Sequence, residues 1–510
     1  MSYIRVSVLQ IGEADWSAVM KLPYYITWNY LDINGDRFST RRLLNVKKPY
    51  DVVFVDECPS DELVEKLWRV VRPYTLYVVN TVSISDVFRE FIAKKKGKVA
   101  LKSDIDYIVS DELDCFYADS HGHKFLPSDI SINRSFNGMP IWHGGFDVEL
   151  DGEYGNDFNQ VSFWKKNISL HDNQTMDFWL EYFKDDSVEL ELHIELYKSG
   201  SVATVIREWI FTEDDMKNIV SIKNDAEEGD LFISLFAKGS GKLEITTLHY
   251  RQSRGYRGFF LPGGQRIVTK NREEIFYYFN PGDMKPPLNV FFGDYRTKEG
   301  FEGENLMDEY GSPYLLISDQ RLKGGCFFLG DKEYEEAIVD VIKKYMYELG
   351  FSNDQIVMSG IAMGAYAALY YSCDIKPHTV LIGKPLINLG TVAANETLIR
   401  PEGFPASLDI VNYLSWGQKN TDIVESMNKI IWEKFDKSEW YDTSFIVLHM
   451  YEDDYDNTAY EDLIQHIDSE NVRLYGIGLH GRHNDDNAGI KKWFNQQYQN
   501  VLVEDFGRLY

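Results

Sequence analysis

Cysteine is scarce in this chain of 510 residues, and so is positive charge. The four cysteines include no C-x-x-C pair, which argues against a disulfide framework and a zinc site and favours a reducing compartment. The 53 Lys and Arg residues are outnumbered by 80 Asp and Glu residues, so the formal net charge is −27. Because such a surface repels phosphate groups, we expect no nucleic-acid partner, and contact with an anionic membrane only through other proteins.

Long apolar runs and targeting signals are missing as well. No run reaches the roughly 18 apolar residues that a membrane-spanning helix needs, and the first residues lack the regions of a signal peptide. A cytoplasmic protein is therefore expected, peripheral to the membrane only through partners. No G-x-G-x-x-G follows the first predicted strand, and the acidic run at 452–456 lacks the glycine of an EF-hand loop. We therefore predict no bound cofactor and no metal.

The length of the chain and two changes in its pattern of polar and apolar residues predict a multidomain α/β protein with three domains. In residues 1–125, short apolar runs at 51–56 and 74–79 enclose a helical pattern at 61–71. Strand, helix and strand in that order form a βαβ unit, so this part is expected to be a Rossmann-like scaffold domain.

Residues 126–262 are predicted to form an antiparallel β-sandwich. Polar and apolar residues alternate strictly at 188–196, and two more apolar runs follow at 231–236 and 243–248. The glycine-rich segment at 251–264 is expected to be a linker or domain edge. Four tryptophans in this domain could stack on sugars, although such residues more often lie in a core: Trp142, Trp164, Trp179 and Trp209.

Residues 263–510 alternate strand and helix patterns, which predicts a doubly wound α/β-hydrolase-like domain with its chemistry at the carboxyl ends of the strands. An amphipathic helix is expected at 332–349, ended by Gly350, and a last helix from Asn484. The predicted strands are 288–292, 314–317, a short strand that contains Ile356 and Val357, 378–382, 445–449 and 472–477.

The segment at 354–369 carries the strongest motif in the chain. A polar start leads into a short apolar strand, then Gly360 and Gly364 flank Ala362, and a run of small residues follows. This is the G-x-S-x-G nucleophile elbow of an α/β hydrolase with alanine in place of serine. The two glycines leave room for a strained residue between them, and the small residues let a helix pack closely on the strand.

An acid and a histidine follow the elbow in the order that α/β hydrolases use. Glu452 and Asp453 are the first candidates for the acid, with Asp454 behind them, just past the strand at 445–449. His483 stands directly before the last helix, and His480 is the alternative. In such a triad the histidine takes the nucleophile's proton, and the carboxylate orients the ring and stabilises its charged form.

An oxyanion hole needs two N–H donors that are already in place. The residue after the nucleophile position, Met363, should supply one of them, and Asp294 or Tyr295 in the loop after the strand at 288–292 should supply the other. Arg296 in the same loop could hold an acidic or carbonyl group, or could be a surface arginine.

Alanine cannot act as a nucleophile, and Ser359 stands three residues too early to replace it. Either the chain carries a serine-to-alanine substitution that traps an inactive form, or it is a natural pseudoenzyme. The intact glycine frame around Ala362, together with a retained acid and histidine, favours the substitution.

With these motifs, the sequence resembles the second accessory secretory protein family of the streptococcal accessory Sec system over the whole chain. The residues that carry the resemblance are 359–364, 451–453 and 480–483, together with the length and the acidic balance. The resemblance implies a Ser–Glu–His triad, with the nucleophile at Ala362, the acid at Glu452 and the base at His483. The missing serine is the departure from the family pattern, and it predicts an inactive chain.

The resemblance also implies a function and partners. The function is O-acetylation of N-acetylglucosamine on serine-rich repeat adhesins, coupled to export of these glycoproteins, with an acetyl donor that the sequence does not identify. The partners are the first and third accessory secretory proteins and the accessory motor ATPase. A carbohydrate esterase would use the same site with water, and a non-catalytic assembly module is the alternative from another class of protein.

Overall fold

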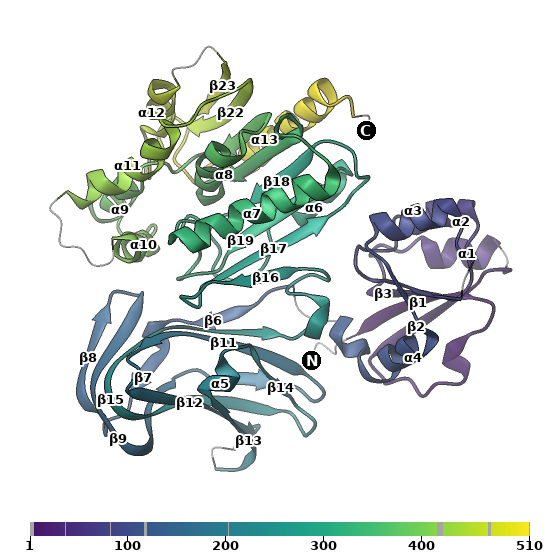
Figure 1. Cartoon of the computed structure of the whole chain (residues 1–510), viewed down its shortest axis with the longest axis horizontal. Helices are drawn as coiled ribbons and strands as arrows, with labels where there is room; N and C mark the ends of the chain where they lie inside the picture. Colours follow the sequence, from purple (N-terminus) through teal and green to yellow (C-terminus); the bar gives the residue numbers. More distant parts are fainter. Residues whose placement is uncertain are drawn as a thin grey trace.

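The computed structural model describes residues 5–35, 37–81, 83–116, 120–201, 203–415, 422–467 and 471–508. These residues form three β-sheets, each from a different part of the chain, and Figure 1 shows the first sheet to one side of the other two. The first sheet is parallel, the second is antiparallel and the third is mixed. The predicted α/β fold class with three kinds of architecture is confirmed.

The first sheet has the strand order β2-β1-β3-β4-β5, with all neighbours parallel. The predicted βαβ unit is present as β3, α2 and β4, and the side chain of Ser60 caps α2 by accepting from the amide of Leu63. The elements are β1 (Val6–Gly12), β2 (Ile26–Asp32), α1 (Arg37–Leu44), β3 (Val52–Val55), α2 (Asp61–Leu67), β4 (Leu76–Val79), α3 (Asp86–Lys94), β5 (Lys98–Ala100) and α4 (Lys102–Asp111).

The second sheet is built around one long strand, β15 (Gly229–Gln252). Two separate strands were expected here, but Gly239 and Gly241 take positive φ angles of 95° and 132°, so the chain bends without leaving the sheet. The first half of β15 pairs with β12 and the second half with β11. Trp164 and Trp179 are buried, as core residues are.

The other elements of this part, in chain order, are β6 (His123–Phe125), β7 (Ile130–Ile132), β8 (Asn137–His143), β9 (Asp147–Trp164), β10 (Ile168–Leu170), β11 (Thr175–Lys184), β12 (Val188–Lys198), β13 (Val205–Thr212), α5 (Glu213–Met216) and β14 (Val220–Lys223).

The third sheet has the order β16-β17-β19-β18-β20-β21-β22-β23, parallel from β19 to β23. Its strands are β16 (Gln265–Val268), β17 (Glu274–Asn280), β18 (Leu288–Phe292), β19 (Tyr314–Asp319), β20 (Ile356–Ile361), β21 (Thr379–Gly383), β22 (Thr443–Met450) and β23 (Val472–Leu479). Its helices are α6 (Glu304–Tyr310), α7 (Lys332–Leu349), α8 (Met363–Ile375), α9 (Leu389–Leu398), α10 (Ala406–Leu414), α11 (Ile423–Phe435), α12 (Ala459–His466) and α13 (Asn487–Asn500), followed by a π-helical turn (Val501–Asp505).

Helix α7, which belongs to this part of the chain, has the predicted bounds. Gly350 ends it with a left-handed backbone conformation. The last helix begins at Asn487, three residues later than expected, because Asp486 caps it by accepting from the amide of Gly489. Within the described segments, every helix is too short or too polar to cross a lipid bilayer.

The segment at 251–264 was expected to be a linker or domain edge; most of its residues are buried, with Gly255 and Tyr256 exposed, which does not fit a linker. Arg251 is 4% exposed and donates to the carboxylates of Glu274 and Glu299. His249 forms an ion pair with Glu299 as well. Burial alone would raise the pKa of Glu299, but the charges of Arg251 and His249 outweigh it and lower the pKa to about 2. A network of buried ion pairs therefore joins the second and third sheets.

Replacing Glu299 with glutamine is expected to lower the free energy of unfolding by about 3 kcal/mol, because Arg251 and His249 would each lose one buried counter-charge and keep only Glu274 and Glu181 as partners. Since the folded-state pKa of Glu299 lies below its unfolded value, its contribution is present above about pH 4.5 and is lost as the pH falls toward 2. Urea unfolding at neutral pH measures the effect. Glu425→Gln, which breaks an exposed pair with Lys429, is the control and should leave the free energy of unfolding nearly unchanged.

Candidate active site

The turn between β20 and α8 has the backbone of a nucleophile elbow. Ala362 lies between the last residue of the strand and the first residue of the helix, with φ 48° and ψ −109°. A residue other than glycine rarely adopts such angles, which cost on the order of 1–3 kcal/mol and persist only where the surroundings enforce them. The amide of Ala362 donates to Gly383 O at 2.9 Å, which ties the elbow to the end of β21.

The two flanking glycines are required by close backbone contacts. A Cβ atom on Gly360 would lie 2.2 Å from the carbonyl carbon of Gly364, and one on Gly364 would lie 2.2 Å from Phe292 O. Helix α8 therefore approaches β20 and β18 more closely than any side chain would allow. The hydroxyl of Ser359 is 3.3 Å from Val290 O and 3.2 Å from the Tyr498 hydroxyl inside the protein, so it is not placed to replace a nucleophile at 362.

The structure pairs the acids and histidines differently from the first expectation. Nδ1 of His483 lies 2.7 Å from Oδ2 of Asp453, and both side chains are about 5% exposed. Glu452 instead contacts His480, with 3.0 Å between Oε1 and Nδ1, and accepts from the amide of Gly481 at 2.6 Å. The expected hydrogen bond between Glu452 and His483 is therefore wrong, and the alternative Asp453 is the partner.

The turn after β22 explains this choice of partner. Oδ1 of Asp453 accepts from the amides of Tyr455 and Asp456 at 2.9 Å and 3.1 Å, so the side chain folds back into the turn and its other oxygen faces His483. Glu452 precedes it by one residue and faces the solvent, with 55% of its side chain exposed. Asp454, the third candidate, accepts from the amide of His483 at 3.3 Å and pairs with Arg400.

The surroundings of His483 suit a neutral imidazole. Burial lowers its pKa below 6.5, and the hydrogen bond and charge of Asp453 oppose that shift only in part. With the proton on Nδ1 shared with Asp453, Nε2 is left as the acceptor. This is the tautomer that a general base needs.

Both expected oxyanion donors contact the same side chain. The amide of Met363 donates to Oδ1 of Asp294 at 3.2 Å, and the amide of Tyr295 donates to the same oxygen at 2.7 Å. The amide of Asp294, the other candidate for the second donor, faces away and donates to Glu302 at 2.8 Å. A carboxylate oxygen of the protein thus lies where two N–H groups converge next to the elbow.

Burial and the neighbouring Glu302 raise the pKa of Asp294 to about 7, although the two amides and Lys384 favour its charged form. Lys384 is not among the site residues that the sequence predicts. It follows β21 with a positive φ of 38°, is 5% exposed, and its Nζ lies 3.3 Å from His483 O and 3.1 Å from Oδ1 of Asn487. Its only sequence signal is its position directly after a predicted strand. Burial lowers the pKa of this lysine.

The remaining candidate, Arg296, donates to Phe301 O at 2.7 Å and so holds its own loop together. No group of three or more His, Cys, Asp or Glu side chains in the described ranges is arranged to hold a metal ion.

These groups come from the carboxyl ends of adjacent parallel strands, β18, β20, β21, β22 and β23, and therefore lie along one edge of the third sheet. Fold and elbow together define an α/β-hydrolase-like domain with alanine, a residue without a hydroxyl, at the elbow.

Comparison with known proteins identifies the family. The chain belongs to the accessory Sec system GspB-transporter family, whose model matches residues 6–508. It is 37% identical to the second accessory Sec system protein of Streptococcus gordonii, over 99% of both chains, and 31% identical to that of Staphylococcus aureus, over 99% of this chain and 98% of the relative. In a solved Glycosylation Associate Protein (Gap123) complex from Streptococcus agalactiae, one chain is 33% identical, with a TM-score of 0.88 and complete coverage of both chains.

Proposed function

We propose that this chain carries the acyl-transfer site of a carbohydrate O-acetyltransferase, and that the site is silent because Ala362 stands at the nucleophile position. The observation that carries the proposal is the strained elbow at Ala362 on the same sheet edge as the buried hydrogen bond between His483 and Asp453. An ordinary turn from strand to helix has no need for a positive φ at an alanine. A turn that once presented a nucleophile does need a positive φ at this position.

With serine at position 362, Nε2 of His483 would take the hydroxyl proton while the oxygen attacks the acetyl carbon. The amides of Met363 and Tyr295 would donate to the oxygen that becomes negative, and Asp453 would hold the ring. His483 would then give the proton to the leaving group of the activated donor. A sugar hydroxyl would reverse these steps, so that the serine is restored and an O-acetyl sugar is released; water in its place would make the site an esterase.

The resemblance to the second accessory secretory proteins suggests the acceptor and the partners. We propose N-acetylglucosamine on serine-rich repeat glycoproteins as the acceptor, and the first and third accessory secretory proteins and the motor ATPase as partners. The Gap123 complex supports an assembly of this kind, because its matching chain is covered completely. Cytoplasmic location, with membrane contact through these partners, is part of the same proposal.

The test of acetyl transfer uses Ala362→Ser with an aryl acetate as donor and an N-acetylglucosaminyl-serine peptide as acceptor. Mass spectrometry should find the acetyl group on the sugar. Acetate released without any acetylated peptide would favour the esterase, and neither product from a folded variant would contradict the enzyme proposal. The second candidate, a non-catalytic assembly module, is favoured by alanine at 362 and by the Asp294 carboxylate at the oxyanion donors. It would stand if both products were absent.

The position of Asp294 leads to a pH prediction for the Ala362→Ser protein. Activity should fall in acid as His483 gains a proton, at a pH lower than the ordinary histidine pKa of 6.5 because burial lowers the pKa of this ring, and should fall again above about pH 7 as Asp294 ionises and occupies the amides of Met363 and Tyr295. Adding Asp294→Ala should remove the upper limb and raise kcat at pH 8 by at least about tenfold, since one oxyanion donor is worth 10²–10³-fold or about 3–4 kcal/mol. A rate at pH 8 that Asp294→Ala leaves unchanged would contradict a blocking role.

A further inference from the structure

The backbone of Lys384 is fixed to both strands that flank β21. The amide of Lys384 donates to Leu448 O of β22 at 2.6 Å. The residue before it, Gly383, accepts from the amide of Ala362 at the end of β20. Lys384 itself takes a left-handed φ of 38°, which a residue other than glycine keeps only where its surroundings enforce it. Its side chain therefore starts from a rigid point beside the elbow.

The ammonium group of Lys384 reaches the segment that carries His483. Nζ donates to His483 O at 3.3 Å, to Oδ1 of Asn484 at 3.3 Å and to Oδ1 of Asn487 at 3.1 Å. Asn487 is the first residue of α13. An ammonium group has three N–H donors, and these three contacts use all of them. One side chain thus joins the end of β21 to the loop and helix that follow β23.

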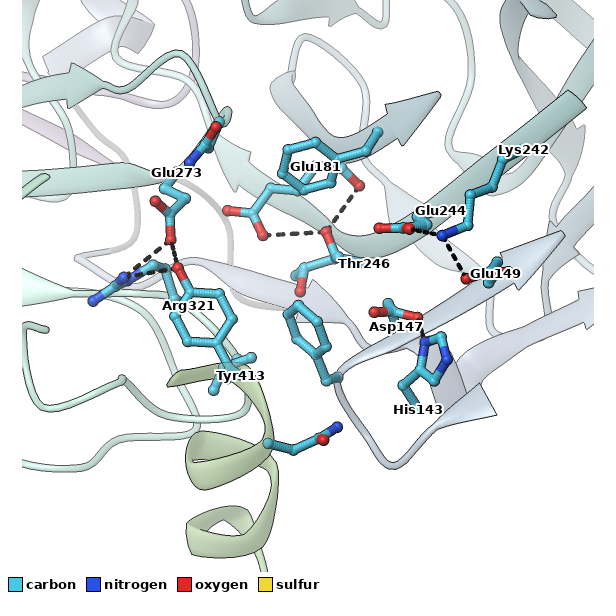
Figure 2. A pocket seen from close by; sticks show the side chains of 16 residues that line it. His143, Asp147, Glu149, Glu181, Lys242, Glu244, Thr246, Glu273, Arg321 and Tyr413 are labelled. Carbon is cyan, nitrogen blue, oxygen red and sulfur yellow. Dashed lines mark hydrogen bonds and ion pairs between the residues drawn. The ribbon is translucent and has the colours of Figure 1, made fainter. Parts of the chain in front are cut away.

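Lys384 differs from Arg321, a buried cation two residues after β19, in its lack of a contacting anion. Arg321 lies 2.8 Å from Asp319 and 3.0 Å from Glu273, and Figure 2 shows it facing Glu273 and Tyr413. Among the described residues, no carboxylate lies within ion-pair distance of Lys384. The carboxylates that act on it lie farther away: Asp294, Asp453 and Glu302. Because a buried charge without a contacting counter-charge destabilises the fold, packing alone does not explain this lysine.

The positive charge of Lys384 also acts on the ring of His483. Burial lowers the pKa of His483 and the charge of Lys384 lowers it further, while Asp453 and Asp454 oppose both. The groups that face the ring come from the turns after β22 and β21: Asp453, Asp454, Tyr455 and Lys384. Lys384 is the cation among these four. It therefore favours the neutral ring that a general base needs.

We propose that Lys384 is a positioning residue of the acyl-transfer site, which holds His483 and the start of α13 in place relative to the elbow. The proposal deepens the proposed function, on which it rests for the role of His483 as a base. Lys384 contacts the backbone of His483 and two asparagine side chains, and so acts on the reaction through the histidine. Its charge has the second effect of keeping the ring neutral.

An NMR titration of the His483 ring in the full chain with Ala362 tests the proposal without turnover. The ring signal is assigned by its loss in His483→Gln. Lys384→Met removes the charge and keeps an unbranched side chain, so the titration midpoint of His483 should move to higher pH. Lys384→Gln, whose neutral amide can still donate, should move it in the same direction and serves if the methionine variant does not fold. Lys492→Met, at an exposed position on α13, is the control and should leave the midpoint unchanged.

Kinetics in the Ala362→Ser protein give a second result that a merely structural lysine would not produce. Adding Lys384→Met should lower kcat for an aryl acetate about 10²-fold, because a displacement of His483 by about 1 Å costs this much. KM should change little, since Lys384 does not contact the ester. The acid limb of the pH profile should move to higher pH, as the NMR midpoint does. Adding Lys492→Met should change none of these quantities.

The two measurements separate failure of this proposal from failure of the proposed function. A His483 midpoint that neither Lys384→Met nor Lys384→Gln raises in folded protein would overturn the proposal. A lowered melting temperature as the sole effect would make Lys384 a structural residue and overturn it too, as would an unchanged kcat in the serine form. Absence of turnover in Ala362→Ser itself would contradict the acyl-transfer site, and the NMR midpoint would still decide whether Lys384 acts on His483.

Discussion

Ala362→Ser is expected to convert a protein without esterase activity into one that hydrolyses an aryl acetate. The elbow glycines, the neutral His483 and the amide of Met363 are already in place, so the hydroxyl is the missing group. Removing the serine of an intact triad costs about 10⁶-fold in kcat, which sets the upper limit of the gain. Asp294 occupies the amides of Met363 and Tyr295 when it is ionised, and its pKa is about 7. The gain in activity should therefore be largest near pH 7. Release of the aryl alcohol, followed by absorbance, measures it.

The control for this substitution is Ala394→Ser in helix α9, which adds a hydroxyl away from the elbow and should give no activity. A folded Ala362→Ser protein with no more turnover than the Ala394→Ser control, also in combination with Asp294→Ala, would contradict the proposed site. The assembly-module function would then be the better account of the chain.

The second large effect separates the two neighbouring acids. In the Ala362→Ser protein, Asp453→Asn should lower kcat by about 10⁴-fold, because the amide cannot hold the tautomer of His483 in which Nε2 accepts the proton. Glu452→Gln, one residue earlier, should change kcat by less than about threefold, since Glu452 is half exposed and its partner His480 is 85% exposed. The same aryl-acetate assay measures both variants, and each protein's melting curve controls for folding.

The opposite ranking would restore the assignment that the family resemblance implies. If Glu452→Gln abolished turnover while Asp453→Asn did not, the ring of His483 would have to change partners in the working enzyme. Equal and small effects from both variants would mean that no carboxylate orients the histidine.

The sequence was informative where a local pattern has one physical solution. Gly360 and Gly364 predict an elbow because only glycine allows those two backbone approaches, and the structure has both. The apolar runs predict the strands of the parallel sheet just as directly, since strands that are buried on both faces are continuous apolar segments. Helix α7 is bounded as predicted because its apolar stripe and its terminal Gly350 agree.

Other features depend on contacts that a single sequence does not display. Three consecutive acids at 452–454 are equivalent in composition, and only the turn that follows β22 directs Asp453 inward. Arg251 sits in a glycine-rich stretch typical of linkers, yet its partners Glu274 and Glu299 come from later in the chain. The side chain of Asp294 was unexpected for the same reason, because its contact with Met363 joins residues 69 positions apart.

The domain boundaries at 125 and 262 stay predictions of the sequence. The three sheets fall in the corresponding parts of the chain, but β6 begins at His123 and already pairs with β15 of the second sheet.

The most direct test of the central claim is the mass of the elbow peptide from Ala362→Ser after brief exposure to an aryl acetate and acid quenching. If the elbow is an acyl-transfer site that has lost its nucleophile, the peptide that contains residue 362 gains one acetyl group. The chain with Ala362 gains none, and His483→Ala in the serine form strongly reduces the adduct. An unmodified elbow peptide in folded Ala362→Ser protein, or an acetyl group found equally on the Ala362 chain, would contradict the claim.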